Sequence, residues 1–402
     1  MQWKPILQGS LRDRALDTVW ALADALFDTE ADPYRGREAS LAHGNAAVAL
    51  FYGYHAKAHK GHGYKELAIA FLARALRSVS SPQESPALYC GTTGVAWVAA
   101  HLQDEAGHGT CLPEWTDTAL LQMLNQSDGG CGVGLFGGLV GQATYALERF
   151  PRPEAIRVLE QVVERLERSA VWSERGVAWL TPADQVPEER RQEAPTGGYD
   201  LSLAHGMAGV IGLLSQIFAL GVAEQRVSRL LRGAVSYIFS HRLDDSSPAS
   251  FPTWITPDQR PVTSGNHSCS GDVGIAAALL MAARAFKEPS WEREALAIAR
   301  RAAGRPPALY GVKEPGFCHG TAGLAHLFNR MYQATGDQEL QRAARFWIEQ
   351  TLALRGPKGP MAGYPADRGL VRGAAGVALA LLAAATSVEP SWDRVFLLSG
   401  AH

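Results

Sequence analysis

Seven short glycine turns, each leading into an apolar segment, constrain this 402-residue chain more than any other feature. The residues after each turn are apolar nearly all round, as in VALALLAA after Gly376. A helix without a polar face is buried on all sides. The first glycines of the turns are Gly44, Gly91, Gly138, Gly206, Gly271, Gly320 and Gly373. Intervals of 47 to 68 residues between them indicate a repeat architecture.

Amphipathic segments lie between the buried helices. Ala155 to Arg168 and Leu340 to Leu352 each place their apolar residues on one stripe. Alternating buried and amphipathic helices predict helical hairpins that close into a ring. The expected fold is an all-α, α/α toroid of seven inner and about seven outer helices, in a single domain over residues 1–402. Gly176 to Leu180 is the only short strand that we expect, within a loop.

Charge and composition exclude several classes of partner. A formal net charge of −2 gives no basic footprint for nucleic acid. The longest apolar run, Ala374 to Thr386, is too short to span a bilayer. Five cysteines, an odd number in a large chain, argue against a disulfide framework. We therefore expect a cytoplasmic protein without a transmembrane segment.

The glycines themselves are interpreted as packing residues. Glycine tolerates unusual backbone angles at the start of a helix and allows close approach. No strand precedes the turns and no Gly-Lys-Ser follows, so a phosphate loop is not indicated.

The residue before each first glycine is predicted to face the same end of the ring. These residues are His43, Cys90, Gly137, His205, Ser270, His319 and Arg372.

One position earlier than these residues, Cys269 and Cys318 stand at equivalent places in the fifth and sixth turns. Two thiolates and an imidazole, Cys269, Cys318 and His319, form a ligand set for tetrahedral zinc, and three protein ligands leave one position open for chemistry. The alternative is that the cysteines are buried small apolar residues. Cys90 and Cys131 are interpreted as packing residues, because another thiolate would close the coordination.

Four further residues are candidates for catalysis or substrate binding. His205 can act as an acid or base beside a metal, or can be a hydrogen-bonded residue at a helix start. His43, in the twin sequence SLAHGNAA, has the same two interpretations. Asp200 either contacts substrate and orients His205, or caps a helix. Asp272 fits substrate binding or the dipole of the helix that it begins.

The turns, the sequence LAHGMAG at Gly206 and the set Cys269, Cys318, His319 resemble the lanthionine synthetase C-like proteins over about residues 39 to 386. The resemblance implies an α/α toroid with zinc at one end. It implies Michael-type addition of a cysteine thiol to a dehydroalanine or dehydrobutyrine residue of a ribosomally made peptide, which forms a thioether (lanthionine). His205 then matches the active-site histidine. The implied substrate is a dehydrated precursor peptide, with a dehydratase or synthetase as a further partner.

The chain also departs from the family pattern. Gly134 stands where the peptide cyclases have an aspartate, and the arginine, tryptophan and tyrosine of the fifth turn are replaced. The replacements are Gly265, Ser268 and Ser270. His43, Arg372, His267 and Asp128 are the candidates to substitute for the lost groups, so Arg372 joins the catalytic candidates and His267 the substrate-binding ones. The loops near 172–198 and 243–268 are expected to face a partner.

Two other functions stay open at this stage. One is a zinc protein that adds a different thiol to an electrophile, and the other is a non-catalytic scaffold that binds a peptide or a partner enzyme. A glycosidase with a helical toroid would need paired carboxylates at the mouth of the ring, where the turns offer only Asp272.

Overall fold

The computed structural model describes residues 2–27, 39–59, 63–79, 85–106, 115–126, 132–186, 188, 191–192, 194–262, 271–354 and 367–400. Almost all regular structure in these ranges is helical. The chain divides into two compact units. Unit 1 comprises Met1–Thr116 and Val312–Asp393, and unit 2 comprises Asp117–Gly311 and Arg394–His402. Within the described ranges, no helix combines the length and the apolar character that a membrane crossing needs.

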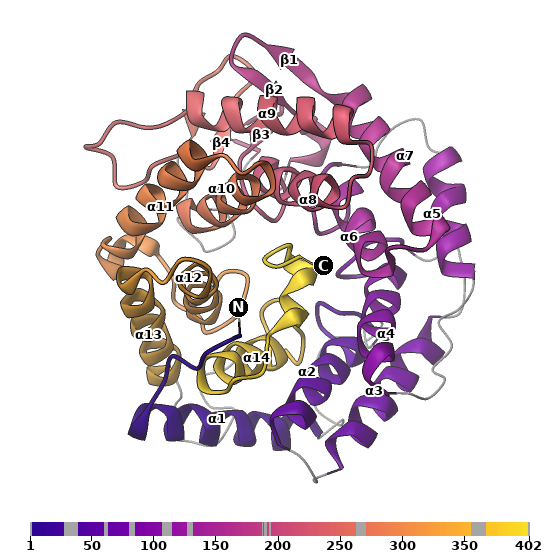
Figure 1. Cartoon of the computed structure of the whole chain (residues 1–402), viewed down its shortest axis with the longest axis vertical. Coiled ribbons are helices and arrows are strands. Elements are labelled where there is room, and N and C mark those ends of the chain that lie inside the picture. The colour runs from indigo at the N-terminus through magenta and orange to yellow at the C-terminus, as the bar shows by residue number, and fades with distance from the viewer. Residues whose placement is uncertain are drawn as a thin grey trace. The chain divides into compact units, whose positions relative to one another are not determined.

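Unit 1 is built from four inner helices covered by three outer ones. The inner helices are α2 (Asn45–Ala58), α4 (Thr92–Ala106), α12 (Thr321–Thr335) and α14 (Ala374–Ala385). They pack side by side in the series α12, α14, α2, α4 (Figure 1). The outer helices are α1 (Gly9–Phe27), α3 (Tyr64–Ser78) and α13 (Gln338–Ala353). Helix α13 packs on α12, α1 on α14, and α3 on α2 and α4.

Unit 2 repeats the same pairing. Its inner helices α6 (Leu139–Arg149), α8 (Met207–Ala219) and α10 (Asp272–Phe286) pack in that order. The outer helices α7 (Pro153–Ser169), α9 (Glu224–Ser240) and α11 (Pro289–Ala303) cover α6, α8 and α10 in turn. Helix α5 (Trp115–Gln126) is tied to α6 because Asp117 accepts hydrogen bonds from Tyr145 and Arg149, at 2.6 and 3.1 Å.

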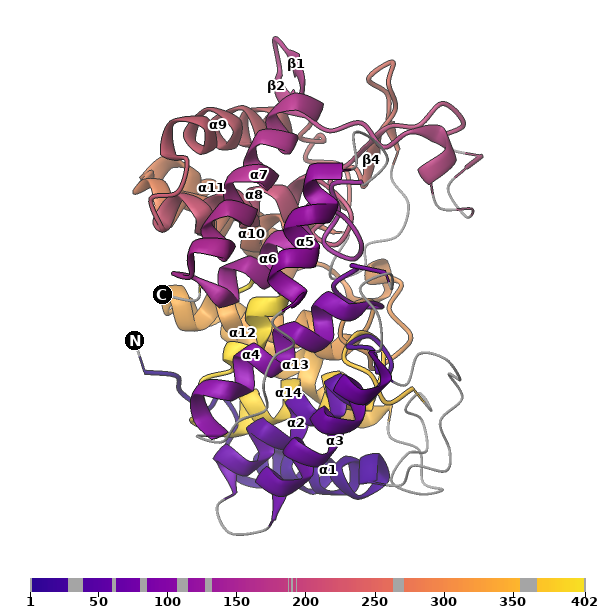
Figure 2. The same ribbon diagram turned by 90° about the vertical axis from the view of Figure 1, so that its right-hand side faces the viewer.

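Two small antiparallel sheets belong to unit 2. Strands β1 (Val171–Ser173) and β2 (Gly176–Ala178) form a hairpin, and β2 packs on α9 (Figure 2). Strands β3 (Tyr199–Asp200), β4 (Trp254–Ile255) and β5 (Pro261–Val262) form the second sheet in that order. The predicted strand at Gly176 is therefore confirmed for three residues, while the second sheet was not predicted.

The glycine register predicts the start of every inner helix. Each of the seven begins at the residue that follows its first glycine, from Asn45 after Gly44 to Ala374 after Gly373. The outer helices show the predicted stripe: in α13, Ala344, Trp347 and Ile348 are buried. The all-α class and the alternation of buried and amphipathic helices are thus confirmed within each unit.

Of the two predicted reasons for glycine, the close approach is confirmed and the unusual backbone angles are wrong. Gly206 and Gly373 have φ values of −138° and −95°, which other residues adopt as readily, so unusual backbone angles do not explain them. The lack of room for a side chain does explain these glycines. At Gly206 the carbonyl oxygen of Asp200 lies where a Cβ would stand, and at Gly373 the carbonyl oxygen of Asp367 does the same. The backbone N–H of Ala374 then donates to that Asp367 oxygen at 2.8 Å, which folds the chain back beneath the helix start.

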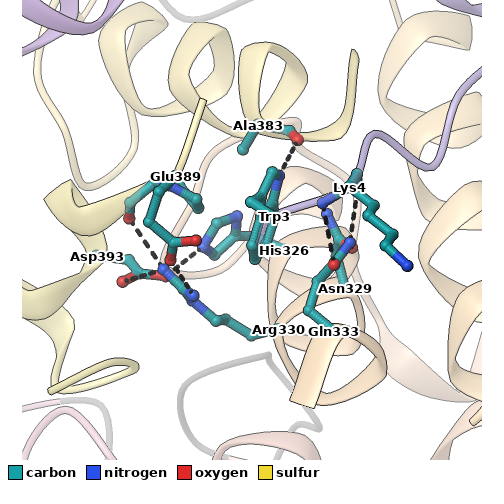
Figure 3. A network of polar contacts seen from close by, with 10 residues as sticks. Trp3, Lys4, His326, Asn329, Arg330, Gln333, Ala383, Glu389 and Asp393 are labelled. Carbon is teal, nitrogen blue, oxygen red and sulfur yellow. Dashed lines mark hydrogen bonds and ion pairs between the residues drawn. The ribbon is translucent and has the colours of Figure 1, made fainter. Parts of the chain in front are cut away.

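A buried ionic network joins both ends of unit 1 to α12 (Figure 3). Trp3 Nε1 donates to the carbonyl of Ala383 at 2.8 Å. Asp393 Oδ2 lies 2.7 Å from His326 Nε2 and accepts from Arg330 Nε at 2.6 Å. Burial alone would raise the pKa of Asp393, but Arg330 and His326 outweigh it and hold that pKa well below its ordinary value. Asp393 therefore stays charged, which fixes the last segment of unit 1 to α12.

We expect Gly376→Ala to lower the free energy of unfolding by about 1–3 kcal/mol, because the carbonyl oxygen of Leu370 occupies the place of the new Cβ. Gly304→Ala is the matched control. Gly304 has φ −80° and its Cβ would make only ordinary contacts at 3.6 and 3.9 Å, so we expect no loss of stability. Urea unfolding measures both; equal stability of the two variants would contradict the close-approach explanation.

Candidate functional site

Backbone hydrogen bonds link the glycine turns of unit 1 into one row. Cys318 N–H of the sixth turn donates to Val371 of the seventh at 2.7 Å, and Leu370 N–H donates to Leu41 of the first at 3.2 Å. Ala42 N–H then donates to Tyr89 of the second turn at 2.7 Å. The residues before the first glycines, His319, Arg372, His43 and Cys90, therefore occupy successive turns at one end of unit 1, as the register predicted.

The predicted zinc ligands of unit 1 are the neighbours Cys318 and His319. Cys318 is 3% exposed and His319 is partly exposed. The third predicted ligand, Cys269, lies outside the described residues, as does His267. Among the side chains that the structure describes, no group of three or more His, Cys, Asp or Glu is placed to hold a metal. A sulfur and a nitrogen donor on adjacent residues of one turn suit zinc. Because Cys269 lies outside the described residues, the complete set of three ligands stays a prediction.

His43 is held between a carboxylate and a thiol. Its Nδ1 lies 2.7 Å from Oδ2 of Asp367, which is 4% exposed, and the Cys90 thiol is a second group that acts on the His43 ring. The hydrogen bond to Asp367 and then that to Cys90 raise the pKa of His43 to about 9, against the opposing effect of burial. The ring is therefore protonated at neutral pH.

Asp367 was not predicted from the sequence, although a signal existed. Its second oxygen, Oδ1, accepts the N–H of Gly369 at 2.7 Å. Asp200 Oδ1 accepts the N–H of Ser202 at the same distance, and both aspartates lie six residues before a first glycine. The shared register of Asp200 and Asp367 is the feature that could have identified the second carboxylate.

Arg372 carries the second cationic group on this row of turns. Its guanidinium nitrogen Nη2 donates to both carboxylate oxygens of Glu314, at 2.8 and 2.9 Å. The Arg372 side chain is 54% exposed, so the pair is open to solvent and contributes little to stability. An exposed Arg372 is accessible to a ligand.

In unit 2, His205 borders a cavity of about 340 Å³. The His205 side chain is exposed, and its ring packs against Phe136 with centroids 5.1 Å apart. Two tryptophans, Trp179 and Trp254, and the polar side chains of Thr181 and Gln185 also line the cavity. The walls thus come partly from the 172–198 and 243–268 segments, which were expected to face a partner.

The two remaining aspartate candidates differ in their surroundings. Asp200 lines this cavity, which is compatible with the predicted contact to substrate. The predicted helix cap is wrong, because Asp200 Oδ1 accepts the N–H of Ser202 within the turn and no side chain caps α8. Asp272 is 1% exposed and accepts the N–H groups of Ser250 and Phe251, at 2.8 and 3.1 Å, and pairs with buried Arg305. Its carboxylate is used for packing, so we do not include Asp272 among the proposed substrate-binding groups.

A sequence profile of the family described as lanthionine synthetase C-like protein matches residues 37–397. The chain belongs to the lanthionine synthetase C-like family. Its structure is similar to that of nisin cyclase, with a TM-score of 0.79 and 16% identity, over 97% of this chain and 98% of that one. Cellobiose 2-epimerase from Bacillus thermoamylovorans B4167 is also similar, with a TM-score of 0.50 and 12% identity, over 94% and 98% of the two chains. Both likenesses show the fold, and the first confirms the predicted fold class.

Within this lanthionine synthetase C-like chain, the position of the missing aspartate has a structural explanation. A Cβ at Gly134 would lie 3.0 Å from the Cα of His205 in the next turn. Gly316 and Gly369, at the same position of the sixth and seventh turns, are pressed against Arg372 and His43 in the same way. The close contact between neighbouring turns therefore explains a glycine at position 134. The departures Gly265, Ser268 and Ser270 lie outside the described residues.

The charge on His43 gives a test of its surroundings. We expect a titration midpoint of about 9 for His43 in histidine-labelled protein, measured by NMR. Asp367→Asn should lower the midpoint by roughly 1 to 2 units, because the main partner of the imidazolium is lost. Since the folded pKa is raised, the pair stabilises the protein fully below about pH 6.5, and this contribution is lost as the pH rises through about 9.

Ser40→Ala is the control for that titration. The hydroxyl of Ser40 accepts the backbone N–H of His43 at 3.2 Å and does not touch the ring nitrogens through any bond among the described residues, so its removal should leave the midpoint in place. A wild-type midpoint near the ordinary histidine value would contradict the arrangement of His43 with Asp367 and Cys90.

Proposed function

We propose that this lanthionine synthetase C-like protein is a zinc-dependent enzyme that joins a cysteine thiol to a dehydroalanine or dehydrobutyrine residue of a ribosomally made peptide. The row of turns in unit 1 carries the proposal, because it places Cys318, His319 and the charged His43 at one end of the unit. The family match and the likeness to nisin cyclase support this chemistry. The proposed partners are the dehydrated precursor peptide and a dehydratase or synthetase, in the cytoplasm.

Cys269, Cys318 and His319 would hold the zinc. When bound, zinc would supply a deprotonated peptide thiol at neutral pH and leave one coordination position for it. The burial of Cys318 suits a ligand, because a low-dielectric surrounding strengthens the attraction between a thiolate and a cation.

His205 is proposed as the proton donor. The peptide sulfur forms a bond to the β-carbon of the dehydro residue, and the electron pair of the double bond moves toward the α-carbon and its carbonyl. His205 then delivers a proton to the α-carbon. This proton replaces the one that the thiol lost, and the double bond of the dehydro residue becomes a single bond. The cavity lined by Trp179, Trp254 and Asp200 would hold the dehydro residue beside His205.

Positive charge supports the same step. His43 keeps its proton at neutral pH, and Arg372 is a permanent cation on the neighbouring turn of unit 1. Preorganised positive groups stabilise the negative charge that develops during conjugate addition. His267 stays a proposed substrate-binding residue on the basis of the sequence.

The replacement of the cyclase aspartate by Gly134 favours a second candidate function. Because Gly134 leaves the cavity without the carboxylate that peptide cyclases have, the same zinc set would also suit addition of a different, smaller thiol to an electrophile. A peptide substrate and a small thiol can be compared in one assay.

We expect about one zinc per chain, and loss of that zinc in Cys318→Ala, because a structural donor is removed. Elemental analysis of purified protein measures this. Cys90→Ala is the matched control, since Cys90 is exposed, lies on another turn and is not a proposed ligand, and it should keep its zinc. Full zinc occupancy in Cys318→Ala would contradict the ligand assignment.

His205→Asn should lower the rate of thioether formation by about 10² to 10⁴-fold without loss of zinc, because the proton donor is removed. The measurement is loss of free thiol from a dehydrated, cysteine-containing peptide, with mass spectrometry of the product. If zinc-loaded wild-type protein does not exceed the uncatalysed rate with such peptides or with small thiols, the enzyme proposal is contradicted. The remaining function would then be that of a non-catalytic scaffold.

A further inference from the structure

Cys90, His43 and Asp367 form a cluster, and the proposed zinc chemistry uses only the positive charge of His43 and leaves the Cys90 thiol without a role. Asp367 is buried and holds His43 Nδ1 at 2.7 Å, and the thiol of Cys90 interacts with the same imidazole ring. A thiol, an imidazole and a buried carboxylate in this order are the components of an activated cysteine nucleophile. The sequence interpretation of Cys90 as a packing residue is wrong, because its side chain is exposed.

The fold fixes all three members of the cluster. Gly369 N–H holds the second carboxylate oxygen of Asp367, and Ser40 holds the backbone of His43. The bond from Ala42 to Tyr89 sets the turn of Cys90 beside that of His43. Cys90 also lies directly before the N-terminus of α4, and helix N-termini are a common position for reactive thiols.

We propose that Cys90, with His43 and Asp367, is a second reactive centre, which forms a covalent bond with α,β-unsaturated carbonyl compounds independently of zinc. Conjugate addition requires a soft sulfur nucleophile and a proton donor beside it, and it requires no oxidant and no leaving group. The cluster supplies both. Sulfur bonds to the β-carbon, the double-bond electrons move to the α-carbon, and His43 transfers to that carbon the proton that it shares with Cys90.

Acrylamide, the simplest unsaturated amide, is a suitable probe for the zinc-loaded protein at pH 7. We expect one adduct, located at Cys90 by peptide mass spectrometry, that forms at least about ten-fold faster than the adduct of free glutathione. His43→Gln should slow its formation by about 100-fold and Asp367→Asn by about ten-fold, because the proton donor and then the group that holds it in place are lost. Removal of zinc from the wild-type protein with a chelator should leave the rate unchanged.

Two controls separate activation from misfolding. In urea, Cys90 of all variants should react at the same slow rate, and Ser40→Ala should react like wild type in the folded state. Reaction of Cys90 no faster than glutathione, or equal rates in wild type, His43→Gln and Asp367→Asn, would overturn the proposal. Because the readout is an adduct on Cys90 and not peptide cyclisation, failure here leaves the zinc proposal untouched, and failure of the zinc proposal leaves this one standing.

Discussion

The close approach of a backbone carbonyl to the first glycine of a turn is the contact on which the rest of the structure depends. It is found at five first glycines, Gly91, Gly138, Gly206, Gly320 and Gly373. At Gly373 the oxygen of Asp367 fills the space of a side chain and accepts the N–H that begins α14. The same carbonyl belongs to the residue whose carboxylate holds His43. Helix initiation and the placement of reactive groups therefore arise from one turn, so a side chain added at the glycine would disturb both.

The sequence was sufficient for the fold class and for the register of the turns, while the zinc ligand set stays a prediction. Gly-based register and apolar periodicity located each inner helix start, because both are local properties of the chain. Asp367 was missed because its partner His43 lies 324 residues away, and only lateral hydrogen bonds between turns bring them together. The exposure of Cys90 depends on the same neighbours. The backbone angles of Gly206 cannot be inferred from its being a glycine, so the prediction of unusual angles was wrong while that of close approach was confirmed.

Two cysteines at nearly equivalent places have different surroundings. Cys318 is buried and adjoins His319, which suits a metal ligand, whereas Cys90 is exposed and meets a histidine that a carboxylate already holds. A shift of one residue in register separates them: Cys318 stands two residues before its glycine and Cys90 one. This member of the lanthionine synthetase C-like family thus has, besides the proposed zinc ligand Cys318, a second thiol for which we propose activation without metal.

An anomalous difference map at the zinc edge, from crystals of the zinc-loaded protein, tests the central claim most directly. We expect one peak within bonding distance of the sulfurs of Cys269 and Cys318 and of a ring nitrogen of His319, about 2.0–2.3 Å away. Cys90 and His43 should show no peak. A peak at Cys90 and His43 instead, or none at Cys318, would contradict the division of the two thiols into a zinc ligand and a metal-free nucleophile.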